Sequence, residues 1–248
     1  MILVDKVAKG FKAKTGPVQA VKSVSFSAED GQITGLLGPN GAGKTTTLRL
    51  LYGLLKADGG SIQVDGCDVG NNPVEARRRL GVLPDTRGLY TRLSARENIE
   101  YFARLNGVSA RDVESELERL VASLDMSDFI DRRCEGFSQG QRTKTAIARS
   151  VIHRPQNIVL DEPTNGLDVM TTRGLRRFLE SCRAEGRCVV LSTHIMQEVA
   201  ALCDQVVVIA HGSVVAQGSP EELKALSGQA NLEDAFVHLI GSEEGLML

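Results

Sequence analysis

Residues 38–45 read GPNGAGKT and fit the phosphate-loop pattern G-x-x-x-x-G-K-[ST]. The aliphatic run ITGLL at 33–37 leads into this loop, and leucines at 48, 51 and 55 predict a helix from Thr45 to Leu55 that leads out of it. Glycines let the main chain wrap closely around a ligand, so that its N–H groups converge on phosphate oxygens at the positive end of the helix. The pattern therefore favours a fold in which a buried strand ends at an anion-binding turn. The alternative is a glycine-rich turn that binds no ligand.

The same pattern assigns roles within the loop. We expect Lys44 to reach the β and γ phosphates of a nucleotide, and Thr45 to ligate Mg²⁺. The residues expected to bind the nucleotide here are Gly38, Pro39, Asn40, Gly41, Ala42, Gly43, Lys44, Thr45 and Thr46.

Short apolar runs rich in β-branched residues predict strands at 24–28, 33–37, 61–64, 80–83, 157–160 and 188–192. Several of these runs lack alternation, as strands buried on both faces do, and helical patterns lie between many of them. Two later runs, 206–210 and 213–217, flank His211-Gly212 and predict a hairpin. The prediction is an α/β fold with a mainly parallel sheet and an antiparallel β part.

Helical patterns follow one another at 86–154 with little strand between them. Ser94 and Glu97 form a capping box, and Ser109 starts a second helix. One face of that helix is apolar and holds Val113, Leu117, Leu120, Val121 and Leu124. We therefore predict an α-helical subdomain at 86–154, inserted into the sheet domain.

The chain's last part predicts a helical tail at 219–248, which a capping box at Ser219 opens. An amphipathic stripe follows, made of Leu232, Ala235, Phe236, Leu239 and Ile240. This stripe packs on the core or docks a partner. The remaining core is then expected at 1–85 and 155–218, so that residues 1–248 form one domain.

Composition excludes several classes. The 248 residues carry a formal net charge of −2, so nothing demands nucleic acid as a partner. The five cysteines include no C-x-x-C pair, which favours buried thiols in a reducing compartment over zinc or disulfides. The longest aliphatic runs are strand-sized, whereas a bilayer span needs about 20 apolar residues, so we expect no part of the chain to cross a membrane.

Residues 157–163, NIVLDEP, are an apolar strand that ends in two acids. Alternation along a strand points Asp161 and Glu162 in different directions, so they can take different roles. Asp161 suits Mg²⁺, and Glu162 suits a base that polarises an attacking water. A solvated strand end is the alternative. Together with the phosphate loop, this strand indicates the P-loop NTPase core of a nucleoside-triphosphate hydrolase.

Three further segments keep a fixed order: GFSQGQRTKTAIARS before NIVLDEP, TNGLD after it, and LSTH ending at His194. This order resembles the ATP-binding cassette (ABC) family of transporter ATPases, from about residue 3 to residue 218. The resemblance implies that Phe11 stacks on the adenine of ATP, although it could be ordinary core. It also implies that His194 contacts the γ phosphate and that Asp168 lies in a loop that crosses to a neighbouring subunit.

The resemblance also explains the serine- and glycine-rich start of the helix after residue 137. Ser138, Gly140 and Gln141 would close over ATP held by a second, head-to-tail nucleotide-binding domain, and a homodimer is expected. Ser138 and Gln141 also form a capping box, which is compatible with that role. Each chain would then hold half of each of two ATP sites.

The chain departs from the family pattern in two motifs. Residues 137–141 read FSQGQ where the usual sequence is LSGGQ, and Gln139 replaces a glycine there, with little loss expected. Asp85 stands where the family carries a glutamine that touches magnesium and the attacking water. The aspartate can ligate Mg²⁺ but would repel the γ phosphate without metal, so we expect a steeper magnesium dependence.

The resemblance implies a partner that crosses the membrane. The chain would power a separate integral membrane permease from the cytoplasmic face, and the permease would dock beside the loop at 85–93 and the helical subdomain. GLYTRLSARENI and NLEDAFVHLIG resemble exporter cassettes of the drug and sodium-efflux type. The alternatives are a soluble ABC ATPase in DNA repair, chromosome or ribosome function, and a P-loop kinase or GTPase, which would lack FSQGQ and the histidine.

Overall fold

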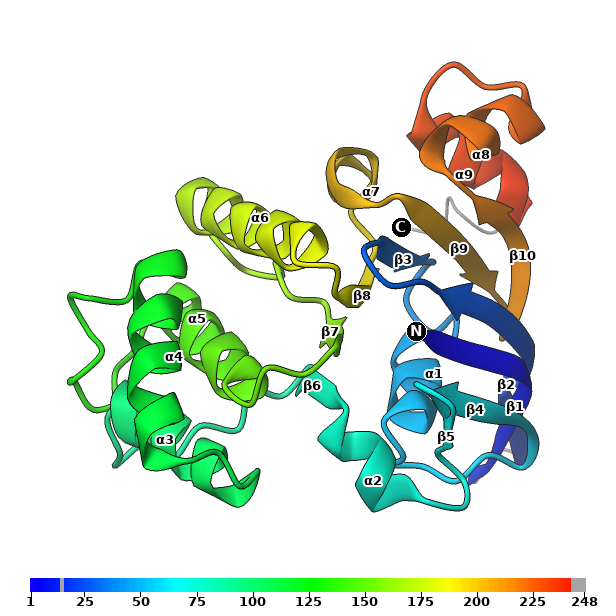
Figure 1. The fold of residues 1–248 in the computed structure, drawn as a ribbon. Coiled ribbons are helices and arrows are strands. Elements are labelled where there is room, and N and C mark those ends of the chain that lie inside the picture. The colour runs from blue at the N-terminus through cyan, green and yellow to red at the C-terminus, as the bar shows by residue number, and fades with distance from the viewer. Residues whose placement is uncertain (14–15, 242–248) are drawn as a thin grey trace.

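A computed structural model describes residues 1–13 and 16–241 of the chain. In this part of the chain, five strands form the parallel half of a sheet: β3 (Ile33–Leu37), β6 (Leu80–Leu83), β7 (Asn157–Asp161), β8 (Cys188–Thr193) and β9 (Gln205–Ala210). Five more extend it: β1 (Ile2–Ala13), β2 (Gly16–Ala28), β4 (Gly59–Val64), β5 (Cys67–Asp68) and β10 (Ser213–Gly218). The sheet order is β5-β4-β1-β2-β10-β9-β3-β8-β7-β6, and the sheet is curled (Figure 1).

The parallel strands form because their residues are apolar on both faces. Every residue of β3, β7 and β8 is buried, which confirms the expectation from their unbroken aliphatic runs. Their parallel pairing aligns the carboxyl ends of the three strands. Leu37 lies opposite Thr193, and Asp161 lies opposite Ser192. Loops that leave these strand ends therefore meet at one edge of the sheet.

The antiparallel part is larger than the sequence indicates. β1 pairs with both β2 and β4, and it was not predicted as a strand; β2 begins at Gly16, not at residue 24. Among residues 2–12 of β1, Ile2, Val4 and Val7 are the buried core residues, and the pairing slips where Lys6 adopts a positive φ of 48°. An irregular, half-exposed edge of this kind lacks the continuous apolar run by which the central strands are recognised.

The helices of the described residues fall into three groups, of which the first follows the strands of the sheet. Those attached to the strands are α1 (Lys44–Leu51), α2 (Pro73–Arg78), α6 (Val169–Ala184) and α7 (Met196–Leu202). α1 is shorter than predicted, because Gly53 takes a left-handed conformation just after the helix and Leu54 is 67% exposed. The leucine at position 55 therefore lies beyond the helix.

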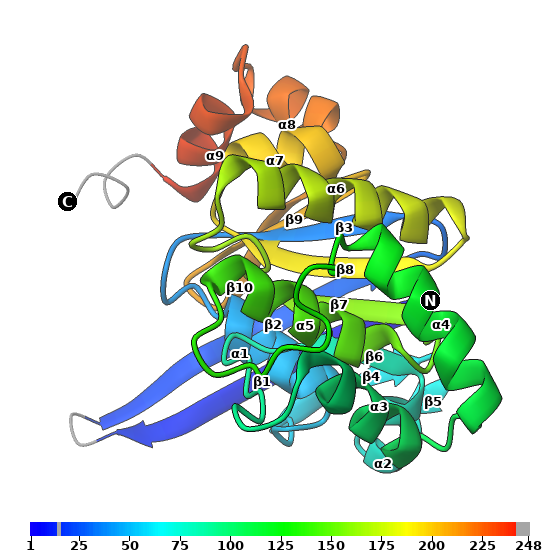
Figure 2. The same cartoon turned by 90° about the vertical axis from the view of Figure 1, so that its left-hand side faces the viewer.

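Three helices form a lobe beside the sheet: α3 (Ala95–Leu105), α4 (Ala110–Ser123) and α5 (Gln139–Val151) (Figures 1 and 2). The capping box of Ser94 and Glu97 is present, and Ser109 caps α4 as predicted. The predicted apolar face of α4 is buried except at Val121, which is partly buried. The expected helical subdomain is therefore a distinct lobe in the described residues.

The C-terminal part contains the predicted hairpin and two helices. His211 and Gly212 both have positive φ, as a two-residue hairpin turn requires, and they join β9 to β10. α8 (Pro220–Ser227) begins at the predicted Ser219 capping box, and α9 (Leu232–Ile240) packs its stripe on the core cluster. The stripe is thus part of the core, and residues 242–248 of the predicted tail lie outside the described residues.

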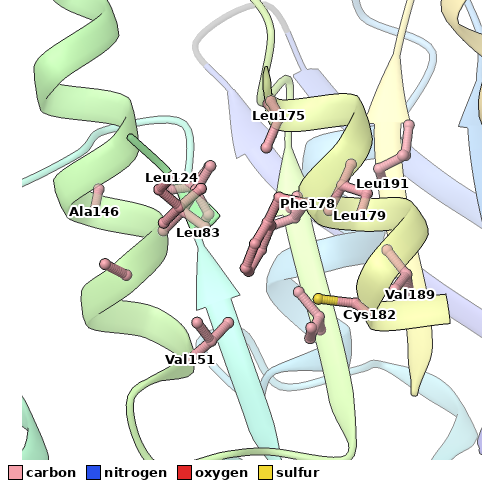
Figure 3. Packing of buried hydrophobic residues seen from close by; sticks show 14 of the residues in the cluster. Leu83, Leu124, Ala146, Val151, Leu175, Phe178, Leu179, Cys182, Val189 and Leu191 are labelled. Carbon is pink, nitrogen blue, oxygen red and sulfur yellow. The ribbon is translucent and has the colours of Figure 1, made fainter. Parts of the chain in front are cut away.

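Two hydrophobic clusters hold these layers together. One joins α1 to the antiparallel part of the sheet, and the other joins the helical lobe, α6 and the opposite sheet face. Figure 3 shows the second cluster between α5 and α6, with Phe178 of α6 among its side chains. The cysteines are all free thiols, and the buried ones are Cys134, Cys182, Cys188 and Cys203, whereas Cys67 is partly exposed.

Candidate functional site

A pocket of about 670 Å³ lies where the loops after β3, β7 and β8 meet. Its lining includes the phosphate loop from Pro39 to Thr46, together with Phe11, Asp85, Glu162 and His194. These residues come from five separate segments of the chain. The fold therefore brings most of the sequence-predicted site residues into one cavity.

The phosphate loop needs its glycines for steric reasons. A Cβ on Gly38 would overlap the carbonyl oxygen of Ile209, and one on Gly43 would lie 2.6 Å from the Ala20 carbonyl oxygen. Gly43 also has a φ of 106°, a left-handed conformation that L side chains rarely adopt, and it precedes the first residue of α1. Only glycine fits at these two positions, and the loop delivers the amino end of α1 to the pocket.

The Lys44 side chain is buried at the base of this loop. Its Nζ donates to the carbonyl oxygens of Gly38 and Pro39, at 2.7 and 3.2 Å, and lies 3.8 Å from Oε1 of Glu162. Burial lowers the pKa of the ammonium below its usual value, and the carboxylates of Glu162 and Asp161 oppose part of that effect. A cation is thus held next to the phosphate cradle.

Asp161 ends β7 and is 1% exposed. Its Oδ1 accepts hydrogen bonds from Ser192 Oγ at 2.5 Å and Thr45 Oγ1 at 3.2 Å, while its Oδ2 is buried and has no hydrogen-bond partner in the structure. Buried carboxylate oxygens are normally paired or bound to a cation, so this orphan oxygen fits a metal ligand. The Thr45 hydroxyl beside it belongs to the same polar cluster.

Glu162 follows β7 and points elsewhere. Its φ of 45° is unusual for a residue with a side chain, and its N–H is fixed by the carbonyl and hydroxyl oxygens of Ser192, at 3.2 and 3.0 Å. Its Oε2 is 2.9 Å from Nδ1 of His194. The two acids therefore separate as expected: Asp161 faces the hydroxyls of Thr45 and Ser192, and Glu162 faces Lys44 and His194.

Phe11 and Asp85 enter the pocket from β1 and from the loop after β6. Phe11 lies on β1 and is 40% exposed, with Lys9 Nζ 5.8 Å from its ring centroid. The alternative that Phe11 is ordinary core is therefore wrong. Asp85 is exposed in the loop after β6. Both positions are open to a ligand that occupies the cavity.

The other predicted residues lie away from this pocket lining. Ser138 and Gln141 form the predicted capping box at the start of α5, and Asp168 caps α6 by accepting from the Thr171 N–H at 2.9 Å. A Cβ built on Gly140 would lie 3.1 Å from the Thr171 hydroxyl, so α5 and α6 begin side by side. Ser138, Gly140, Gln141 and Asp168 thus gather at a second location in the chain.

Sequence reasoning missed four polar residues at or near the pocket, and one of them, Asn165, lines it. Ser192 holds both acids, and Arg87 and Arg149 bind carbonyl groups near them. Ser192 could have been found, because pairing the predicted strands in parallel places it opposite Asp161. The arginines carried no such signal, since their partners are main-chain atoms and not side chains.

A phosphate loop after a central parallel strand, together with an acidic strand end two positions away in the same parallel sheet, defines the P-loop nucleoside-triphosphatases. The sequence profile of the ABC transporter family matches residues 21–165. The chain belongs to this family and is the ATP-binding, ATP-hydrolysing subunit of such a transporter. Among the described residues, no helix is both long and apolar enough to cross a membrane.

Individual relatives agree with this assignment. The ABC transporter ATP-binding protein NatA of Bacillus subtilis (strain 168) is 43% identical over 238 residues, which cover 96% of this chain and 97% of NatA. The Nod factor export ATP-binding protein I of Ralstonia nicotianae is 38% identical, over 87% of this chain and 67% of that protein. A solved structure described as the ATP binding subunit of an ABC transporter superimposes with a TM-score of 0.89 and 28% identity, over 97% of this chain and 100% of that one.

Proposed function

We propose that this chain hydrolyses magnesium-bound ATP in the pocket at the edge of its parallel sheet, and that it does so as a dimer that drives an exporting membrane permease. The observation that carries the proposal is the convergence of the phosphate loop, Asp85, Glu162 and His194 on one cavity. ATP provides a phosphate chain for the loop and an adenine for the exposed ring of Phe11.

The residues around Thr45 fit a magnesium ion. Thr45 and Asp161 would hold it, with the unpartnered Oδ2 of Asp161 as a ligand and Asp85 facing it from the opposite loop. No group of three His, Cys, Asp or Glu that could hold a metal occurs in the described residues, and Mg²⁺ needs none, because phosphates and waters supply most of its ligands. Bound there, the ion would neutralise phosphate charge.

Glu162 is the proposed general base. Its carboxylate lies between the Nζ of Lys44 and the imidazole of His194, and its main chain is fixed by Ser192. A carboxylate held in this way can accept a proton from a water that attacks the γ phosphate. His194 would orient that carboxylate and contact the phosphate, and Lys44 would counter the charge of the β and γ phosphates.

The second cluster of predicted residues supports the dimer. Ser138, Gly140, Gln141 and Asp168 lie at the starts of α5 and α6, outside the pocket that holds Lys44. A helix amino end with a serine and a glycine suits a phosphate. In a head-to-tail pair, this end of one chain would close over the ATP of the other.

Two observations support the permease and its site. The relative from Ralstonia nicotianae is named for export. Tyr90 of the loop at 85–93 and Tyr101 of α3 are 50% and 43% exposed, and their rings meet edge to face at 5.6 Å. Aromatic residues of this kind are enriched at protein interfaces. The chain would thus lie at the cytoplasmic face of the membrane, held there by the permease.

The proposal is tested by phosphate release from ATP and by binding of a fluorescent ATP analogue. We expect Glu162→Gln to lower turnover at least about 100-fold while the analogue still binds, and EDTA to abolish turnover of the wild type. Glu29→Gln, an exposed acid outside the pocket, is the matched control. Glu162→Gln with wild-type turnover would refute the site, and failure to co-purify with any integral membrane protein from its own cells would refute the permease.

A further inference from the structure

Arg87 joins two segments of the pocket through a single guanidinium group. Its Nη1 donates to the carbonyl oxygens of Pro84 at 2.9 Å and Asp85 at 3.4 Å, and lies 3.5 Å from that of Asp161. Its Nη2 donates to the carbonyl oxygen of Glu162 at 3.1 Å. The loop that carries Asp85 and the end of β7 are therefore held together by one side chain.

A second arginine holds the main chain of the first. Arg149 of α5 donates from Nη2 to the carbonyl oxygen of Arg87 at 2.6 Å, and from Nη1 to that of Gly88 at 2.8 Å. Its guanidinium lies 4.5 Å from the ring centroid of Phe102 on α3, and the residue is 8% exposed. These contacts of the buried Arg149 fix the loop at 84–88 to the helix that begins at Ser138.

The contacts of Arg87 show that it acts on the main chain and not on a ligand. All of its hydrogen bonds end at carbonyl oxygens, its Nε is buried without a partner, and the residue does not line the pocket. A planar guanidinium can donate in several fixed directions at once, whereas an ammonium is a compact point charge. Bridging two segments therefore depends on the guanidinium shape as well as on charge.

We propose that Arg87 is a positioning residue for ATP hydrolysis, which sets Asp85 and Glu162 relative to each other and, through Arg149, ties both to the helix that begins at Ser138. The inference rests on the proposed function, because Glu162 acts on a nucleotide only if this pocket is the ATP site. Its consequence is that a movement of α5 reaches the catalytic carboxylate through two side chains.

The test compares Arg87→Ala and Arg87→Lys with the wild type. We expect kcat for ATP hydrolysis to fall about tenfold or more in both variants, because small displacements of a catalytic group are costly, while KM and the affinity for a fluorescent ATP analogue stay within about twofold. Arg79→Ala is the matched control, since it removes a guanidinium that bonds the Asp65 carbonyl oxygen at 2.7 Å outside the pocket, and it should retain kcat.

Each outcome decides the matter. A wild-type kcat in Arg87→Lys would mean that only the charge is needed, and it would overturn the bridging role. An unchanged kcat in Arg87→Ala would overturn that role as well. If Arg87→Ala does not fold, Arg87→Lys alone decides, with its melting temperature compared with that of Arg79→Ala. A wild type without magnesium-dependent turnover would refute the proposed function itself. The comparison of the wild type with Glu162→Gln tests that function separately from the role of Arg87.

Discussion

Asp85 places a carboxylate in a loop that lines the pocket of the phosphate loop, at the position where the family resemblance leads us to expect a glutamine. We expect Asp85→Asn to raise the free Mg²⁺ concentration for half-maximal turnover roughly threefold, because a neutral amide attracts the cation less than a carboxylate does. Phosphate release at saturating ATP, measured across a magnesium series, tests this expectation.

The control for this titration is Asp128→Asn, which removes an exposed carboxylate that does not line the pocket. Its magnesium curve should match that of the wild type. Superimposed curves for Asp85→Asn and the wild type would show instead that Asp85 does not act on the metal.

The sequence predicts the positions of some site residues in the structure but not of others. Lys44, Asp161 and Glu162 sit in short patterns whose spacing reflects their local structure, so the sequence placed them at the pocket. Arg87 and Arg149 bind carbonyl oxygens of distant segments, and any residue type supplies a carbonyl. No pattern of side chains can therefore reveal these contacts before the fold is known.

At the scale of elements, a charge cluster around the buried Glu116 ties α4 to its neighbours. The Glu116 side chain is 2% exposed and accepts from Arg119 at 2.7 Å and Arg154 at 2.6 Å, and Arg119 also reaches Glu185 at the end of α6. Burial, the largest influence, would raise the pKa of Glu116, but the hydrogen bonds and charges of the two arginines outweigh it and leave that pKa below its usual 4.5.

We therefore expect Glu116→Gln to lower the unfolding free energy by about 2 kcal/mol at pH 7, because it leaves two arginines without their buried partner. The lowered pKa gives a stability that is complete above the unfolded value near 4.5 and is lost as the pH falls through the folded value. The difference between variant and wild type should accordingly shrink below pH 4.5.

Urea denaturation at a series of pH values measures this difference. Glu118→Gln is the matched control, since it changes an exposed glutamate on the same helix. Equal stability of Glu116→Gln and Glu118→Gln at pH 7 would mean that the cluster does not hold α4 in place.

Elements also show why sequence reasoning was only partly successful. The central strands and the helices with capping boxes were found, because each carries its own local signal in burial or in a cap. β1 was missed, since its irregular pairing with β2 and β4 stabilises a sequence that is half polar. The end of α1 was misplaced, because the left-handed Gly53 outweighs a leucine spacing that continues beyond it.

At the scale of the whole molecule, the predicted nucleotide-contacting residues form two groups. The first surrounds the pocket with the phosphate loop, and the second lies where α5 and α6 begin. Arg87 and Arg149 link the end of β7 to the last turn of α5, the helix that has Ser138 at its other end. If a second chain docks at Ser138 and moves α5, this connection would pass the movement to Glu162. Assembly and hydrolysis would then be linked.

The linkage requires ATP to bring two chains together. We expect Glu162→Gln, which binds ATP without consuming it, to form a species of twice the 26.7 kDa chain mass when ATP and Mg²⁺ are present, and to be monomeric with ADP. Adding Ser138→Arg, which places a bulky side chain at the amino end of α5, should keep the protein monomeric with ATP while its own pocket still binds the fluorescent analogue.

Light scattering coupled to size exclusion gives the mass in each state. A Glu162→Gln protein that stays monomeric with ATP and Mg²⁺, alone and with its membrane partner, would leave the residues at Ser138 and Asp168 without a nucleotide to contact and would refute the shared site.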